Sequence, residues 1–531
     1  MEPSRRAESF NRTMQQPSYP DAPPVEVTQP VGAPPPLGPP RASVVVPPGP
    51  PAHPRRAHPL LVIALVLSVL ALLVSLVAYV DQRGDARGLA TRLDDANARI
   101  DDLETELEEI PDLEAILEDL FGDLFEESGL PVPGDGGNGF PFGDLDLLQC
   151  LAPAGLAGEI DEVEGTAAEQ IVEVADIVAA DRELTFTAGE PEPTFLDSAE
   201  TEDRIVELNE EEYPTDEAEL DGRLLELLGA VEPGIDLREL VLDLVAGQVA
   251  GFYVPESGEL VVRSDAPDAP LGPTEQVTLA HELEHALADQ NLELLDADLD
   301  AAGADAALAA LSVIEGDASL IGQRFALAHL SVEDQVEVSL SPELADAQTQ
   351  LDAAPYYLAR ELLFPYLEGM SFVCGHLLDG GWDAVDSLYH DPPASTVEIL
   401  FPERYGDEPA DPRGPGDPGE RWDDGRRDTF GAADLLFLFE APADDESLAL
   451  DDPRRAASAW AGGEYVLFTD GPDSAVGISL EAVDGDEELL CEAVQEFVTA
   501  AELDNAAVRC ESSSVRIGIA PDAATAQLLV S

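Results

Sequence analysis

Lysine is absent from the sequence: all 26 basic residues are arginines, and 110 acidic residues give the 531-residue chain a formal net charge of −84. Residues 1–60 hold six arginines and four acids, a balance of +2, so residues 61–531 carry −86. Such an acidic surface repels phosphate groups, which excludes nucleic acid as a partner. Adaptation to salt explains the acidic excess, whereas a codon bias toward arginine explains only the missing lysine.

Cysteine is scarce, and its four residues all lie beyond residue 149: Cys150, Cys374, Cys491 and Cys510. Two disulfides in an oxidising compartment would give this distribution, and buried thiols would give it equally. Three pairings are possible. Proximity in the sequence favours a disulfide between Cys491 and Cys510.

Charged residues are missing from one long stretch, Leu60 to Val80, which is apolar over 21 residues. A run of this length crosses a bilayer as one helix, and no small-residue cleavage site follows it, so we expect an uncleaved transmembrane helix over residues 58–80. Arginines on both sides leave its orientation open. The cysteines and the acidic bulk beyond the span favour a cytoplasmic N-terminus and an extracellular C-terminal part, in a single-pass protein of the cell membrane.

The segments that flank this span lack the pattern of a globular core. Residues 1–57 are rich in proline, which predicts a disordered or polyproline tail. Residues 81–128 carry heptads from Leu89 to Ile110, which predict a short coiled-coil stalk and possible homo-oligomerisation; a single amphipathic helix is the alternative. Glycine and proline mark a linker over residues 129–148, and residues 149–531 remain for a globular domain.

Within residues 149–531 the apolar pattern predicts an α+β fold that is mainly helical, with a small sheet. Helical spacing covers 160–182 and 216–229, and a hairpin is expected over 248–263 around a Pro-Glu-Ser-Gly turn. One helix is expected after Gly272-Pro273, and a second from about Asp305 to Leu330. The acidic stretch 296–300 lacks the later glycine and glutamate of a calcium loop, so we interpret it as a solvated connector.

The helix after Pro273 carries His-Glu-Leu-Glu-His over residues 281–285. His281 and His285 are four residues apart, so their imidazoles lie on one helical face and can bind one metal ion. Glu282 stands where a zinc peptidase places its general base, beside the metal but not bound to it. The pattern predicts a Zn²⁺ site, and a helix with two structural histidines is the alternative.

A catalytic zinc ion takes three protein ligands, and Glu315 is the candidate for the third. Thirty residues separate it from His285, which leaves room for a connector and an antiparallel helix. An acid inside the apolar run 306–330 is costly unless it is paired or bound to a metal, and Gly316 permits close helix approach. His329 is the rival ligand, but it lies about 21 Å further along the helix and cannot share the ion with Glu315.

Further segments carry distinctive residues: Val249–Tyr253 with its turn, Leu279–Gln290, Glu315–Ala318, Phe364–Gly369, Asp391–Thr396 and Ala459–Tyr465. Together they resemble a family of bacterial membrane- or envelope-associated zinc metallopeptidases of gluzincin type, over about residues 160–470. The resemblance implies a zincin-like fold, with His281, His285 and Glu315 as zinc ligands and Glu282 as the base. The sequence departs from the family at Val254 and Glu464, where aspartate is usual, and at Val397 and Leu400, where polar residues are expected.

These features predict a membrane-anchored, zinc-dependent endopeptidase that hydrolyses protein or peptide substrates outside the cytoplasm. Two functions stay open for residues near the metal. The donor to the oxyanion is one of Tyr366, His376, His390 and Tyr465, and an imidazole is oriented by Asp317 or Asp289. The alternatives are a non-catalytic envelope assembly protein that keeps the fold, against which the intact Glu282 argues, and a tethered interaction module in which the proline-rich tail binds.

Overall fold

The computed structural model describes residues 149–151 and 162–531, except 249, 256, 265, 267–268, 293–302 and 340. All described residues belong to one compact unit. The predicted tail (1–57), membrane span (58–80), stalk (81–128) and linker (129–148) therefore lie outside the described residues.

The fold-class prediction needs correction where it includes a transmembrane helix, which the described residues do not support. Over the described ranges, no helix is both long enough and apolar enough to cross a bilayer. The longest of them, α10 (Ala304–His329) and α13 (Tyr356–Gly380), are interrupted by charged residues such as Asp317 and Glu368. The predicted single-pass localisation in the cell membrane, with an extracellular catalytic domain, needs the same correction, because no described helix supports it. The structure supports the α+β part of the prediction alone.

Helices form most of the chain between residues 162 and 400. In chain order they are α5 (Ala167–Asp181), α6 (Ser198–Glu212), α7 (Thr215–Leu227), α8 (Leu237–Gln248), α9 (Pro273–Asn291), α10, α11 (Val332–Ser339), α12 (Pro342–Ala353), α13, α14 (Trp382–His390) and α15 (Thr396–Leu400). Helices α5 and α7 confirm the helical spacing predicted over 160–182 and 216–229. Side-chain oxygens satisfy the exposed N–H groups at several helix starts, as Thr166 and Glu169 do at α5.

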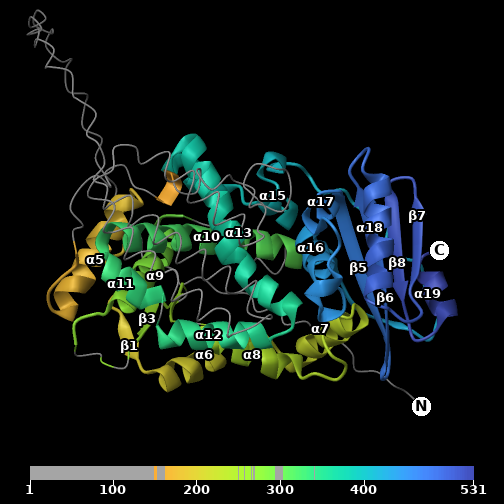
Figure 1. Cartoon of the computed structure of the whole chain (residues 1–531), viewed down its shortest axis with the longest axis horizontal. Coiled ribbons are helices and arrows are strands. Elements are labelled where there is room, and N and C mark those ends of the chain that lie inside the picture. Colours follow the sequence, from red (N-terminus) through yellow and green to blue (C-terminus); the bar gives the residue numbers. More distant parts are fainter. Residues whose placement is uncertain are drawn as a thin grey trace, which may run out of the picture. The chain divides into compact units, whose positions relative to one another are not determined.

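Three helices, α9, α10 and α13, run through the centre of the helical part (Figure 1). Helix α9 contributes fully buried leucine side chains to one apolar core cluster, including Leu279, Leu283 and Leu287. The same core cluster contains Phe325 of α10. Each such side chain stabilises the fold by about 1.5–3 kcal/mol through burial, so apolar packing holds the pair together.

A three-stranded sheet lies against α9. Its strands are β1 (Thr194–Leu196), β2 (Gly251–Val254) and β3 (Glu259–Arg263), in the order β1-β3-β2. The antiparallel pair β2–β3 confirms the predicted hairpin, and its turn closes with a bond from Gly258 N to Val254 O of 2.8 Å. The parallel strand β1 was not predicted, because it is only three residues long. In the strand order β1-β3-β2, strand β2 lies at an edge of the sheet.

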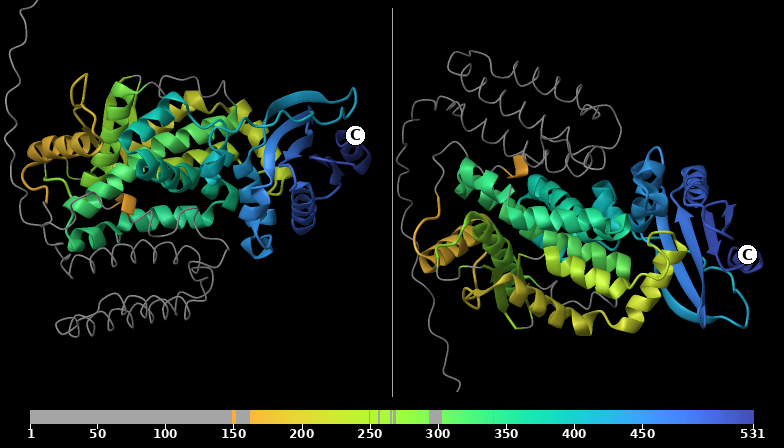
Figure 2. Two further views of the ribbon diagram at one scale, coloured as in Figure 1. Left: turned by 90° about the horizontal axis from the view of Figure 1, so that it is seen from above. Right: turned by 60° about the horizontal axis from the view of Figure 1, so that its bottom comes forward.

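A second sheet, larger than the small sheet that the sequence predicts, occupies the C-terminal part. Its strands are β4 (Asp423–Thr429), β5 (Trp460–Asp470), β6 (Asp473–Ala482), β7 (Ala507–Glu511) and β8 (Ser514–Ile519), all antiparallel, in the order β4-β5-β6-β8-β7. Alternate residues of β5 enter two different cores: Tyr465 and Leu467 the main one, Val466 and Phe468 a smaller one. Both faces of this sheet are thus covered (Figure 2).

Short helices complete this part: α16 (Ala432–Glu440), α17 (Pro453–Ala457), α18 (Glu487–Ala500) and α19 (Ala523–Leu529), with 3₁₀ turns η4 (Pro402–Arg404), η5 (Pro442–Asp444) and η6 (Glu446–Leu448). One apolar core runs from α10 through α13 and α16 into β5 and β6, so the helical part and the sheet share their interior. A disulfide between Cys491 of α18 and Cys510 of β7 confirms the predicted pairing. Cys150 and Cys374 are buried.

Candidate metal centre

Helix α9 begins where the sequence predicts. Pro273 occupies its first turn, and the Glu275 carboxylate accepts a hydrogen bond of 2.7 Å from Gly272 N, which caps the helix start. The helix then continues without a break to Asn291. His281 and His285 therefore lie one turn apart on the same face, and their Nε2 atoms are 3.2 Å apart.

The third predicted ligand reaches the same point from α10, which confirms the expected second helix with bounds Ala304–His329. Glu315 Oε2 lies 3.3 Å from His281 Nε2 and 3.5 Å from His285 Nε2. Burial opposes ionisation of Glu315, but the two imidazoles outweigh it and hold its pKa below the ordinary value. Among the described residues, these three form the one group of His, Cys, Asp and Glu side chains close enough to hold a metal ion.

The spacing of the three donor atoms fits zinc. A tetrahedral Zn²⁺ bonded to nitrogen or oxygen at about 2.0–2.2 Å needs neighbouring donors about 3.3–3.6 Å apart. The separations of 3.3 and 3.5 Å fall within this range, and the separation of 3.2 Å lies just below it. Two imidazoles and one carboxylate leave a fourth position for water or substrate, which is the donor set of a catalytic rather than a structural zinc site.

Glu282 lies beside the donor triangle and is not part of it. Its side chain is 5% exposed, and burial raises its pKa to about 8; the His281 ring opposes this shift and the Glu315 charge adds to it. Strand β2 crosses close to this carboxylate. A Cβ atom on Gly251 would lie 2.7 Å from Thr278 Cγ2 and 3.3 Å from Glu282 Cγ, so the strand approaches α9 only because residue 251 is glycine.

A close crossing of α10 and α13 fixes the other side of the site. A Cβ atom on Gly316 would lie 2.3 Å from the Gly369 carbonyl carbon, and one on Gly369 would lie 2.1 Å from Ser312 O. Two glycines thus let the backbones touch one residue after Glu315. This crossing brings Tyr366 of α13 to the donor set: its ring stacks on the His281 ring, with the two ring centroids 6.3 Å apart.

The remaining predicted oxyanion donors have other surroundings. His376 packs between Phe372 and Tyr405, with ring centroids 4.6 and 5.1 Å away, and burial lowers its pKa. His390 is exposed at the end of α14, and Tyr465 is buried in β5. Of the four candidates, Tyr366 is the one that the structure places against the predicted ligands.

The two predicted orienting acids contact other groups than the imidazoles. Asp289 Oδ2 accepts a hydrogen bond of 2.7 Å from Tyr253 Oη, which ties β2 to the last turn of α9. Asp317 Oδ2 accepts one of 3.0 Å from Arg182 Nε. Arg182 could not be singled out from the sequence, because its partner lies 135 residues further along the chain. The rival ligand His329 stacks on Phe325 at 5.2 Å, at the far end of α10.

Two of the motifs that carry the family resemblance lie at the start of α10, not at the donor triangle. Thr396 N and Oγ1 both donate to the buried carboxylate of Asp305 in the first helical turn. Ala304 N donates to Asp428 Oδ1 at 3.2 Å, which satisfies another N–H group of that turn. Thr396 and Asp428 therefore fix where α10 begins.

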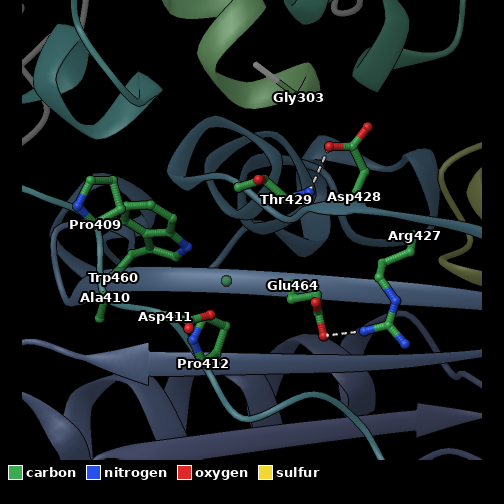
Figure 3. A pocket seen from close by; sticks show the side chains of 11 residues that line it. Gly303, Pro409, Ala410, Asp411, Pro412, Arg427, Asp428, Thr429, Trp460 and Glu464 are labelled. Atoms are coloured by element: carbon green, nitrogen blue, oxygen red, sulfur yellow. Dashed lines mark hydrogen bonds and ion pairs between the residues drawn. The ribbon is translucent and has the colours of Figure 1, made fainter. Parts of the chain in front are cut away.

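A pocket of about 490 Å³ opens at this helix start, between Gly303, Trp460 and Asp428 (Figure 3). Glu464, where the resembling family has aspartate, lines it and pairs with Arg427 at 2.8 Å. Twelve residues of helix, about 18 Å, separate Gly303 from Glu315, so this pocket is distinct from the donor triangle.

No family model, curated protein or solved structure matches this chain. The assignment of a function therefore depends on the geometry of the His281, His285 and Glu315 cluster and of the groups beside it.

Proposed function

We propose that the protein is a zinc-dependent endopeptidase, with His281, His285 and Glu315 as the zinc ligands and Glu282 as the general base. The observation that carries the proposal is the nearly equilateral donor triangle, with sides of 3.2–3.5 Å, beside a buried carboxylate that does not belong to it. When bound, zinc supplies Lewis-acid polarisation of the substrate carbonyl and of water.

Glu282 moves the proton in this reaction. Its carboxylate takes a proton from water as the water oxygen bonds to the carbonyl carbon, and it returns that proton to the amine nitrogen as the C–N bond breaks. Removal from solvent suits Glu282 to both roles, because burial brings its pKa to about 8, close to neutral pH. The Tyr366 hydroxyl, at the rim of the donor set, is the donor that would stabilise the charge that develops on the carbonyl oxygen.

The strand beside Glu282 supports a peptide as the substrate. Arg263 N bonds to Ala250 O, so by alternation the peptide groups of Gly251 and Tyr253 point away from β3, toward the edge of the sheet. Among the described strands none pairs with this edge of β2. An extended peptide can therefore add to the sheet at a strand that Gly251 holds against Glu282.

Zinc content and turnover of the full-length protein test the proposal. We expect about one zinc per chain, hydrolysis of casein, and loss of both in His281→Ala. Glu282→Gln should keep the zinc and lose turnover by a factor of at least about 100, since it removes the base and leaves the ligands. His329→Ala, a histidine variant on α10 outside the triangle, should keep both.

Each negative result has its own meaning. A wild-type protein without zinc would reject the metal site. A protein that binds zinc but is as inactive as its Glu282→Gln variant would be the non-catalytic alternative. Full turnover by Glu282→Gln would reject the assigned base.

A further inference from the structure

One buried arginine contacts both helices that carry the predicted ligands. Arg182 follows the last residue of α5, and its side chain is 0% exposed. Its Nε lies 3.0 Å from Asp317 Oδ2 of α10 and 3.7 Å from Glu284 Oε1 of α9. Its Nη2 lies 2.7 Å from Asp386 Oδ1 of α14, and the guanidinium lies 4.5 Å from the centre of the Trp382 ring.

The positions of the two helical acids connect this arginine to the donor set. Glu284 immediately precedes His285, and Asp317 follows Glu315 by two residues. One guanidinium is therefore hydrogen-bonded to Asp317 on α10 and forms a longer ion pair with Glu284 on α9, so it contacts a neighbour of a predicted ligand on each helix. The two helices also contribute apolar side chains, such as Leu283 and Phe325, to one core cluster. Apolar contacts have no preferred direction, whereas a planar guanidinium fixes the positions of the groups it binds.

Stability of the fold does not explain this network. Removing a guanidinium and its carboxylates from water costs several kcal/mol per ion, and replacing such a group by apolar residues of similar volume is often neutral or stabilising. Arg182 Nη1 also has no hydrogen-bond partner among the described residues, which adds to the cost. What the arginine contributes instead is a fixed relation between two helices.

We propose that Arg182 is a positioning residue of the metal centre: through Glu284 and Asp317, its guanidinium sets the register of α9 against α10 that places the three donor atoms 3.2–3.5 Å apart. The inference rests on the proposed function, because it takes the donor triangle to be a zinc site. Tyr389 supports the same network, since its hydroxyl donates to Asp317 Oδ2 at 3.1 Å.

Zinc affinity of Arg182→Met, measured in the full-length protein by competition with a chromophoric chelator, tests this role. The change keeps much of the side-chain volume and removes the guanidinium. We expect zinc to bind about 10–100-fold more weakly than in the wild type, the usual effect of removing a group that orients metal ligands. Turnover at saturating zinc is a second readout, but the affinity is decisive.

Arg324→Met is the matched control. Arg324 is a partly buried arginine on α10: it pairs with Asp181 at 2.5 and 2.7 Å and lies 5.7 Å from the same Trp382 ring that Arg182 contacts. Its ion pair does not include Glu284 or Asp317. We expect its zinc affinity to stay within about threefold of the wild type, as for a change away from the metal. An equal loss in both variants, or wild-type affinity in a folded Arg182→Met protein, would overturn the proposal.

Arg182→Met leaves two buried acids without their cation, so it can fail to fold. In that case the triple variant Arg182→Met, Glu284→Gln, Asp317→Asn removes the buried charges together. The proposal requires this variant to fold and still to bind zinc weakly; wild-type affinity, or failure to fold, would overturn it. A wild-type protein that binds no zinc would reject the proposed function itself, which separates the two failures.

Discussion

Tyr366 and Glu282 reach the donor triangle from different helices, α13 and α9. Glu282 is next to a ligand in the sequence, so any helix that presents His281 and His285 also presents Glu282. Tyr366 is near the ligands only because of the way α13 crosses α10. The ring remains 37% exposed, which leaves its face toward solvent and substrate.

Replacing Tyr366 with phenylalanine isolates the hydroxyl. We expect kcat for peptide hydrolysis to fall by about 100-fold, the usual cost of losing one donor to a developing oxyanion, with zinc content unchanged. Tyr405→Phe is the control, because the Tyr405 hydroxyl donates to Asp391 O and lies outside the ligand set. If Tyr366→Phe kept the wild-type kcat, the Tyr366 hydroxyl would not be the donor to the carbonyl oxygen.

The chemistry of the candidate site is predictable from sequence where the residues are local. His281, Glu282 and His285 share one helix, and Glu315 comes on the next one. The Arg182 network is not predictable, because its partners come from α9, α10 and α14 and share no spacing. Tyr366 is one of four candidates in the sequence. The choice among them depends on a helix crossing that periodicity does not report.

At the scale of elements, the contact of Gly316 with Gly369 decides how deeply α10 and α13 interlock. Gly316→Ala places a methyl group against backbone atoms, which cannot move as a side chain does. We expect the free energy of unfolding, measured with urea, to fall by about 1–3 kcal/mol, and zinc affinity to fall because the crossing moves next to Glu315.

Gly322→Ala is the matched control on the same helix. Its Cβ atom would lie 3.6 Å from His281 Cβ, an ordinary contact distance. There the gain in helix propensity, up to about 1 kcal/mol, should make the variant as stable as the wild type or more so. Equal losses in the two variants would show that the short backbone contact at Gly316 is not what limits the packing.

Element prediction from sequence is accurate where periodicity is strong and poor where strands are short. The predicted hairpin appears as β2 and β3, and the predicted helices as α9 and α10. The five-stranded sheet is missed as a unit because both its faces are covered, so a strand such as β5 reads as a continuous apolar run from Tyr465 to Phe468 rather than an alternating one. Strand β1 is only three residues long, too short to show the alternating pattern of a strand.

At the scale of the whole molecule, charge is the dominant feature. With a formal net charge of −84, like charges lie within a Debye length of one another at low ionic strength, and their repulsion opposes the compact state. Raising the salt concentration from about 0.01 M to 1 M shortens that length from about 30 Å to 3 Å. The melting temperature should therefore rise steeply with NaCl and equally with KCl. If monovalent salt leaves the melting temperature unchanged and micromolar Ca²⁺ raises it, the acidic residues form discrete cation-binding sites and the screening explanation is wrong.

Several buried acids give stability a second dependence, on pH. Burial raises the pKa of Asp434 to about 7, although the hydrogen bond from Tyr357 opposes the shift and Asp305 adds to it. Burial also raises the pKa of Asp221 and Asp305. Because these folded-state values exceed the ordinary value of about 4, the stabilising contribution is complete below about pH 4 and is lost as the pH rises through about 7.

The metal-free protein should therefore melt at a higher temperature at pH 5 than at pH 8. A chelator is needed in this experiment, since acid also weakens zinc binding by protonating histidine. Asp434→Asn keeps one acceptor oxygen for Tyr357 and cannot ionise, so it should flatten part of the pH profile. A melting temperature that falls between pH 8 and pH 5 in the wild type would contradict the expected sign.

The chain order of the candidate site has a consequence for synthesis. His281, His285 and Glu315 leave the ribosome before Gly369, which locks α10 in place, and before Asp386, which completes the network of Arg182. A nascent chain that ends at α10 thus carries every ligand while the spacing between the ligands is still adjustable. A zinc ion bound at that stage would be held by two helices whose relative position is not yet fixed. We expect the spacing of the ligands to become fixed only when α13 and α14 have emerged and docked, which happens while the strands of the C-terminal sheet are still being synthesised.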